Sequence, residues 1–228
     1  MDVGLSIAAS GMVAEQVRED QYANDLANAS TPGYKATADV QSAFGAILMQ
    51  SQGQSVGQID TNTEITGQVP DVTQSALQST GQPLDFAVSG AGFFAVKTAN
   101  GVHYTRNGQF SQSASGDLVD ANGNQVLSQS GQPIKVSAGG SVPVSTIGLF
   151  NVRSPVAVGN NLFTGSAAGK PNGLIEAGVL ESSGVDPAKT IVGMIASLNT
   201  YQAGQQAIQA INQTLQESAT SAGSLPGA

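Results

Sequence analysis

Apolar residues recur at helical spacing at the two ends of the chain and not between them, and this restricts the fold more than any other sequence feature. In the first 33 residues the positions that share one face of a helix are largely apolar, namely Leu5, Ala8, Ala9, Met12, Ala23, Leu26 and Ala27. Val13 and Val17 form a second patch, which Asn24 and Asn28 continue. A helix that is apolar on more than one side usually has more than one neighbour. The pattern therefore predicts an N-terminal helix over residues 1–33 that serves as a core and assembly domain.

The C-terminal pattern predicts a second helix within residues 181–220. Asp186 is a favoured N-cap residue and Pro187 suits the first helical position. Spacings of three and four then alternate through Ile191, Met194, Leu198, Tyr201, Gln205, Ile208, Asn212 and Leu215. This is a heptad seam in which Gln205 and Asn212 occupy core positions, where polar residues can fix the register between helices. The seam fits pairing with residues 1–33 and equally fits packing against its own domain. Residues 221–228 are expected to fray.

The middle of the chain indicates β structure. Residues 34–82 are rich in Gly, Gln, Ser and Thr and are expected to form an extended arm with short strands. Residues 83–180 are expected to form the central β domain and its connection to the last helix. The strand patterns are dense up to residue 152, and a connection rich in Gly, Asn and Pro begins at residue 153. Asn100-Gly101 and Asn122-Gly123 stand between strand patterns, which is a strong hairpin signal. The expected fold class is α+β: terminal helices paired as a coiled-coil-like stalk, with a central, mainly β domain built of hairpins.

Charge and composition exclude several classes of function. Charged residues make up 11% of the 228 residues, against about 25% in ordinary globular chains, which suits surfaces that are buried against neutral neighbours. The eight basic residues are scattered, so no nucleic-acid interface is expected. The first residues resemble no cleavable signal peptide, and no apolar run is long enough to insert into a membrane. The chain has no Cys and one His, which argues against a transition-metal site.

Three short motifs match catalytic or ligand-binding patterns but lack the required context. "GQSVG" at 53–57 lies in a polar tract and not between a strand and a helix, as a nucleophile elbow requires. "GAGFFA" at 90–95 precedes a strand pattern and not a helix, so its glycines are expected to allow a sharp bend. "DANGN" at 120–124 lacks the Gly and Glu of a calcium loop and fits a tight turn. We therefore predict no catalytic, cofactor-binding or metal-binding residue.

The stretch "YANDLANASTPGYK" at 22–35 is expected to form the joint between the first helix and the arm. Asn24 and Asn28 lie one helical turn apart, and we predict that their amides bind adjacent subunits in an assembly. Thr31 precedes a proline, which disfavours the helical conformation. Pro32 and Gly33 then form a turn, and Tyr34 begins the run outward.

Three segments, in order, resemble the flagellar rod and hook protein family. They are the stretch at 10–36 that ends in "ANDLANASTPGYKA", the central "LDFAVSGAGFFAV", "YTRNGQF" and "GDLVDANGNQVL", and the C-terminal "GVLESSGVDPAKTIVGMIASLNTY". Asp25 departs from the family's usual Asn-Asn pair, and Gly184 stands where Asn is frequent. The length and the "GFF" and "YTRNGQF" contexts favour a rod protein over the hook protein, and within the rod we favour the distal over the proximal segment.

This resemblance implies a structural subunit of the bacterial basal body that polymerises into the helical drive shaft carrying motor torque to the hook and filament. The implied partners are other copies of the chain, neighbouring rod and hook proteins, the flagellar type III export apparatus and basal-body ring proteins. Export without a cleaved signal peptide is also implied. A proximal rod or hook-type protein of the same family is an alternative. A secreted β-domain binding protein with a helical stalk is a second alternative, of a different class.

Overall fold

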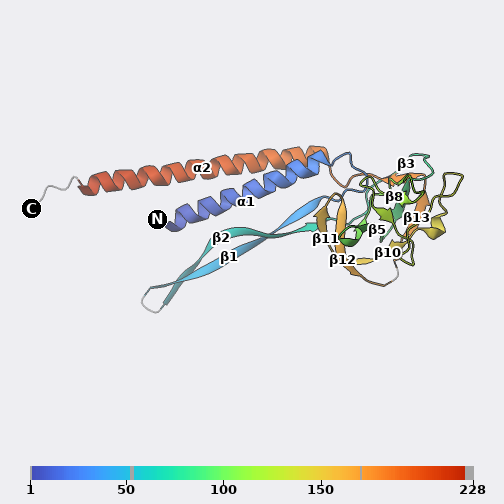
Figure 1. Cartoon of the computed structure of the whole chain (residues 1–228). Helices are drawn as coiled ribbons and strands as arrows, with labels where there is room; N and C mark the ends of the chain where they lie inside the picture. Colours follow the sequence, from blue (N-terminus) through green and yellow to red (C-terminus); the bar gives the residue numbers. More distant parts are fainter. Residues whose placement is uncertain (1, 52–53, 170, 224–228) are drawn as a thin grey trace, which may run out of the picture. The chain divides into compact units, whose positions relative to one another are not determined.

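Two long helices occupy the ends of the chain in the computed structural model, which describes residues 2–51, 54–169 and 171–223 (Figure 1). The first helix is α1 (Asp2–Ala27), and the last is α2 (Pro187–Gly223). The chain forms two units. The helical unit contains α1, a hairpin of two strands and α2, and the β module contains residues 27–38 and 69–186. The predicted α+β organisation, with paired terminal helices and a central antiparallel β domain, is confirmed.

Small residues of α2 form the seam with α1. A Cβ atom on Gly193 would lie 2.7 Å from Cζ of Tyr22, and one on Gly204 would lie 2.8 Å from Cγ of Met12. Between these points the hydroxyl of Ser197 donates to Oε2 of Glu15 over 2.7 Å. As the α2 positions ascend, the α1 positions descend, so the helices run antiparallel. The close approach of the two backbones depends on the missing side chains of the glycines.

α1 ends earlier than the sequence-based expectation, and α2 extends slightly beyond it. α1 ends at Ala27 and not near residue 33. Beyond it, the Thr31 amide donates to the Asn28 carbonyl over 3.0 Å, and the Thr31 hydroxyl donates to Oδ1 of Asn28 over 3.2 Å. These local bonds form a turn before Pro32. α2 begins at Pro187, as predicted, and extends to Gly223, while residues 224–228 lie outside the described chain.

The arm contains long strands where short ones were expected. β1 (Thr37–Ser51) and β2 (Gln54–Pro70) pair as a two-stranded sheet. The sequence carried a signal for the second strand, because Ile59, Thr61, Thr63, Ile65 and Val69 put β-branched residues at alternate positions. Such residues favour extended backbone.

The β module is built on an antiparallel sheet of eight strands with the order β11-β12-β6-β5-β9-β8-β7, where β10 also pairs with β5. Two smaller sheets pair β13 with β4 and β14 with β3. The bounds are β3 (Leu77–Ser79), β4 (Phe86–Ser89), β5 (Phe93–Thr98), β6 (Gly101–Thr105), β7 (Ser111–Gln112), β8 (Leu118–Val119), β9 (Gln125–Val126), η1 (Val144–Thr146), β10 (Leu149–Phe150), β11 (Val152–Gly159), β12 (Leu162–Ala167), β13 (Leu174–Ala177) and β14 (Val179–Glu181).

The core of the β module lies between these strands. Phe86, Val88, Phe94, Val96 and Leu118 are fully buried in it. Each such side chain contributes roughly 1.5–3 kcal/mol relative to an exposed position. The Gly90 and Gly92 backbone, at φ 96° and 140°, makes the bend before β5 that was predicted for "GAGFFA".

One type of turn occurs four times between residues 113 and 141. Each copy starts at a Ser or Asp whose side-chain oxygen accepts the amide of the residue four positions later. The glycine three positions after the start has φ between 70° and 82°. The starts are Ser113, Asp120, Ser128 and Ser137, and the glycines are Gly116, Gly123, Gly131 and Gly140. "DANGN" is the second copy, and the Asp120 carboxylate is occupied by the amides of its own turn.

Strands β11, β12, β13 and β14 lie in the part of the chain where a loose connection was expected. β11 and β12 are joined by Asn160 and Asn161, which have φ of 51° and 59°. Two successive residues at positive φ make the tight turn that matches the twist of a hairpin, and asparagine tolerates that conformation. An Asn pair that resembles loop composition is therefore a hairpin turn.

Candidate functional site

An ion cluster of Lys35, Arg106 and Glu181 lies buried in the β module where the connections to the helices leave it. The Lys35 ammonium donates to Oε1 of Glu181 and to the carbonyl of Thr73, each over 2.6 Å. The side chains of Lys35 and Glu181 are both fully buried. Burial lowers the pKa of Lys35, and the hydrogen bond and charge of Glu181 oppose that shift.

Arg106 completes the cluster from the loop after β6. Its Nη1 lies 3.4 Å from Oε2 of Glu181, and its Nη2 donates to the carbonyl of Gly90 over 2.9 Å. The guanidinium lies 5.2 Å from the ring centre of Phe93, within cation–π range. Burial lowers the pKa of Arg106, with Glu181 again opposing the shift. The Nε group is buried and makes no hydrogen bond.

The predicted joint residues lie beside this cluster. The Gly33 amide donates to the carbonyl of Glu181 over 2.8 Å, and the Pro32 carbonyl accepts the side-chain amide of Asn161 over 3.0 Å. Gly33 has φ 64°, and a Cβ atom there would overlap the carbonyl group of Arg106. Tyr34 accepts the Gly184 amide over 2.8 Å through its carbonyl. The joint is therefore held by hydrogen bonds to Asn161, Glu181 and Gly184 of the β module as well as by its own turn.

Sequence reasoning missed all three residues of the ion cluster. Lys35 and Glu181 are separated by 146 positions, so local pattern could not pair them. They do occur inside the two terminal motifs that carry the family resemblance, "TPGYK" and "LESS". A full positive charge and a carboxylate with no access to solvent can hold chain segments in register, but they cannot meet a dissolved substrate.

The predicted assembly residues of α1 divide between inward and outward positions. Met12 contacts Gly204 of α2, and Leu26 is half-buried. Leu5, Val13 and Val17 are exposed, Val13 to 61%. Asn24 is exposed and Asn28 is half-buried at the turn. Asp25, the departure from the family pattern, is buried and accepts a 2.8 Å hydrogen bond from the side-chain amide of Gln21.

In α2 the half-buried members of the predicted seam are Met194, Leu198, Tyr201 and Ile208, while Ile191, Gln205, Asn212 and Leu215 are exposed. Gly193, Ser197 and Gly204 contribute to the contact with α1 instead. Val192 and Ile195, which the seam did not include, are 67% and 53% exposed. The single chain thus leaves apolar and amide side chains of both helices uncovered.

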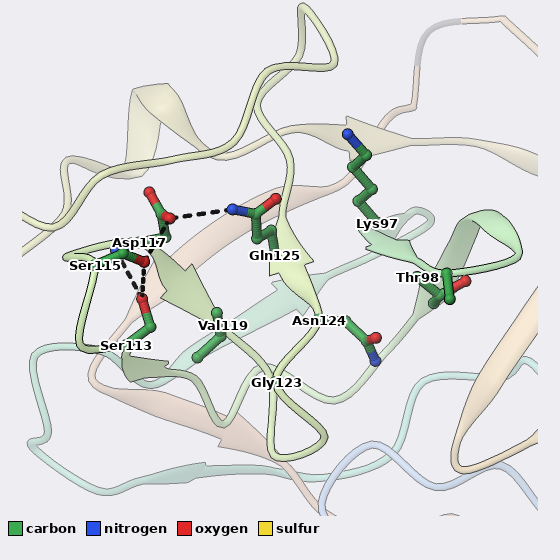
Figure 2. A pocket seen from close by; sticks show the side chains of 10 residues that line it. Lys97, Thr98, Ser113, Ser115, Asp117, Val119, Gly123, Asn124 and Gln125 are labelled. Atoms are coloured by element: carbon green, nitrogen blue, oxygen red, sulfur yellow. Dashed lines mark hydrogen bonds between the residues drawn. The ribbon is translucent and has the colours of Figure 1, made fainter.

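A concave surface on the β module is a second candidate site. It has a volume of about 390 Å³ and is lined by Lys97, Thr98, Ala99, Ser113, Ser115, Asp117, Val119, Gly123, Asn124 and Gln125. Figure 2 shows Asp117 bonded to its neighbours in the first turn copy and to Gln125, while Lys97 stands apart. Lys135 and Ser115 hold the pKa of Asp117 below its usual range. Among the residues that the structure describes, no group of His, Cys, Asp or Glu could hold a metal ion. The residues that line the concavity come from the end of the β5–β6 hairpin and from the turns that start at Ser113 and Asp120.

The fold and its exposed surfaces define a two-part protein, in which antiparallel terminal helices leave apolar side chains for neighbours and a separate β module holds the core. Comparison with known proteins shows that three parts of the chain match flagellar protein families. Residues 5–35 match the family described as flagella basal body rod protein, residues 87–152 match the flagellar hook protein FlgE/F/G D1 domain, and residues 176–221 match the flagellar basal body rod FlgEFG protein C-terminal family.

Curated relatives extend the match to nearly the whole chain. The flagellar hook-basal body complex protein FlhO of Bacillus subtilis is 30% identical over 97% of this chain and 99% of its own length. The flagellar basal-body rod protein FlgG of the same organism is 28% identical over 91% and 94%. FlgF of Rhizobium meliloti is 32% identical over 66% and 60%. The chain belongs to the flagellar basal-body rod protein family, and its role is structural. No helix in the described part of the chain is long and apolar enough to span a membrane.

Proposed function

We propose that this protein polymerises through its helical unit into the axial rod of the bacterial flagellum and transmits motor torque toward the hook and filament. The observation that carries this proposal is the uncovered apolar surface of α1 and α2. Of the large apolar side chains that are exposed in the described chain, seven lie on these helices: Leu5, Val13, Val17, Ile191, Val192, Ile195 and Leu215.

The positions of these side chains fit a helical polymer. Val13 and Val17 lie one turn apart on α1, and Val192 and Ile195 lie three positions apart on α2, so each helix presents a contiguous strip. Subunits related by a helical operator use different patches on their two faces. We propose that the exposed amides of Asn24, Gln205 and Asn212 add hydrogen bonds within the same contacts.

The low charge of the chain supports dense packing of subunits. A charge that is buried without a partner is costly, and a chain with 11% charged residues has few to bury. We propose that the partners are other copies of this chain, neighbouring rod and hook proteins, and basal-body ring proteins. Delivery through the flagellar type III export apparatus, without a cleaved signal peptide, is part of the same proposal. No catalytic step is included.

We propose that the subunit belongs to the distal segment of the rod, and relatives named FlgG match 89–91% of the chain. Relatives named FlgF match it as well, so a proximal position is the alternative within the family. Immunogold labelling of isolated basal bodies distinguishes the two: label at the hook-proximal end of the rod supports the distal assignment, and label beside the motor rings overturns it.

The assembly proposal is tested by placing charge on the exposed helix strip. The double variant Val192→Asp, Ile195→Asp should fail to enter basal bodies and abolish swimming, because two carboxylates would be buried at a subunit contact. Val156→Asp is the matched control, since Val156 is a 55% exposed valine of the β module, and it should swim. Both proteins should keep the thermal unfolding midpoint of the β module. Normal swimming by the double variant would overturn the proposal.

A further inference from the structure

The chain passes between the helical unit and the β module four times, after residues 26, 38, 68 and 186. Three segments of the β module adjoin these crossings: residues 27–38, residues 69–76 and residues 181–186. They are far apart in sequence and lie side by side in the β module. Their contacts converge on one residue of the ion cluster, Glu181.

Glu181 bonds to both of the other segments. Its carboxylate Oε1 accepts the Lys35 ammonium over 2.6 Å and the backbone amide of Ser75 over 2.8 Å. Its main-chain carbonyl accepts the Gly33 amide over 2.8 Å. One buried residue therefore joins the segment after α1, the segment after β2 and the segment before α2.

Bonds from neighbouring residues repeat the same links. The Lys35 ammonium also binds the Thr73 carbonyl, and the Ser182 amide donates to the Ala76 carbonyl over 2.9 Å. The Gly184 amide donates to the Tyr34 carbonyl over 2.8 Å. Arg106 anchors Glu181 to the rest of the module, because its guanidinium also reaches the carbonyl of Gly90. Each of the three segments is therefore bonded to both of the others.

The buried charges of the ion cluster affect how the three segments can open, that is, separate from one another and expose their hydrogen bonds to water. A buried ion pair adds little stability over an apolar replacement, but the loss of one partner leaves the other charged and unsolvated. If residues 181–186 moved away, Lys35, Arg106 and the Ser75 amide would all lose Glu181 as their acceptor. If residues 27–38 moved away, Glu181 would lose the Lys35 ammonium and the Gly33 amide. If residues 69–76 moved away, Lys35 would lose the Thr73 carbonyl and Glu181 would lose the Ser75 amide. Partial opening is therefore costly, and opening of all three segments together is favoured.

We propose that the ion cluster is a coupling node that makes residues 27–38, 69–76 and 181–186 open and close as one cooperative unit. Force that enters the β module at any of the four crossings is then shared among the three segments. The mechanical meaning rests on the proposed rod function, but the cooperativity itself is a property of the isolated subunit. Lys35, Arg106 and Glu181 act as positioning residues.

The test is native-state amide hydrogen exchange, measured by NMR on the full-length protein. The reporters are the amides of Gly33, Ser75, Ser182 and Gly184, which lie on the three segments. In Glu181→Gln all four should lose protection together, by roughly a hundredfold to a thousandfold. The Leu127 amide, which donates to Ala95 in the sheet, should keep its protection. Loss confined to Ser75 and Gly33, which bond directly to Glu181, would overturn the proposal.

Lys35→Met provides the second variant if Glu181→Gln does not fold, because it removes a buried cation and leaves Glu181 its bonds to Arg106 and Ser75. The same four amides should lose protection together by a smaller common factor, and independent changes would overturn the proposal. Lys135→Met is the control, since it removes the exposed Lys135 that pairs with Asp117 in the same module and should leave all four unchanged.

The two proposals can fail separately. If the four amides respond independently in a subunit that enters basal bodies, the coupling node is excluded and the rod function is retained. If the four amides respond together in a subunit that never enters basal bodies, the coupling node is retained and the rod function is excluded.

Discussion

The helical unit and the β module bury their apolar residues to very different degrees. Among the described residues, twenty of the twenty-one buried apolar side chains lie between Phe86 and Leu180 in the β module, and the exception is Ala14 of α1. The helices instead expose side chains such as Val13, Val192 and Ile195. The β module has an apolar core of its own, whereas the helical unit has apolar surfaces that only neighbouring molecules could cover.

We infer from this contrast that the β module is stable by itself and that the helices serve assembly. Helices in water gain most of their stability from packing of an apolar face and little from propensity. α1 and α2 approach each other closely at two glycines and a serine of α2, and both helices keep large apolar side chains exposed. Binding of neighbouring subunits to the folded helices then stabilises them by mass action. The β module needs no such help and provides the fixed frame on which the connections are held.

The largest expected difference comes from matched truncations in the two regions. Phe94→Ala should lower the free energy of unfolding of the isolated protein by about 3–5 kcal/mol, because Phe94 is fully buried against Phe110 with ring centres 5.3 Å apart. Ile195→Ala, on the exposed face of α2, should change it by less than about 0.5 kcal/mol but should weaken assembly. Chemical denaturation followed by fluorescence or circular dichroism measures both. Equal losses would contradict the contrast.

Gly11 of α1 and Gly193 of α2 have different surroundings. A Cβ atom at Gly11 meets nothing within 4 Å, whereas at Gly193 it meets the Tyr22 ring. Gly11→Ala should therefore stabilise α1 by about 0.5–1 kcal/mol and so raise the helix content. Gly193→Ala should lose that gain, since overpacking costs about 1–3 kcal/mol. Far-ultraviolet circular dichroism of the two variants under identical conditions decides it, and an equal increase would mean that Gly193 does not face α1.

The repeated turns of the β module allow a smaller test. Gly131→Ala forces a side chain into positive φ, at 76°, and should cost about 1–2 kcal/mol although no neighbour would clash. Gly139→Ala, in the fourth copy but without positive φ, should cost almost nothing. Thermal unfolding of the β module measures the difference. Equal midpoints would show that this region does not form the turns described.

The smallest effect concerns the Asp117 carboxylate in the first of those turns. Its pKa is lowered by the hydrogen bond from Lys135 and by that from Ser115. A lowered pKa in the folded state stabilises the fold above the ordinary aspartate pKa, and the contribution disappears as pH falls through the folded pKa. Lys135→Met should raise the Asp117 pKa toward its ordinary value, as an NMR pH titration would show. An unchanged pKa would assign the shift to Ser115 and Gln125 alone.

Local chemistry explains which parts of the fold were predictable. Asp186 and Pro187 mark the start of α2 because capping depends on adjacent residues, and the Asn-Gly pairs mark hairpins for the same reason. The Ser or Asp that precedes Gly by three positions, from Ser113 to Ser137, was a readable repeat that went unrecognised. The contacts of Gly193 and Gly204 with α1 were not predictable from apolar spacing, since these residues contribute by lacking side chains.

The ion cluster was beyond local reasoning for a different reason. Lys35 and Glu181 become partners only when the chain ends of the β module meet, and a single charged residue in a polar stretch ordinarily indicates an exposed position. Buried lysines are rare unless paired. Family resemblance located the motifs that hold both residues, but the structure was needed to show that they touch.

The central claim is that the helical unit depends on neighbouring subunits whereas the β module does not. Hydrogen–deuterium exchange mass spectrometry of the free protein and of isolated rods that contain it tests this directly. We expect peptides from α1 and α2 to exchange much faster in the free protein than in rods, and peptides covering β4, β5 and β9 to exchange equally slowly in both. Helix peptides that are already fully protected in the free protein would contradict the claim.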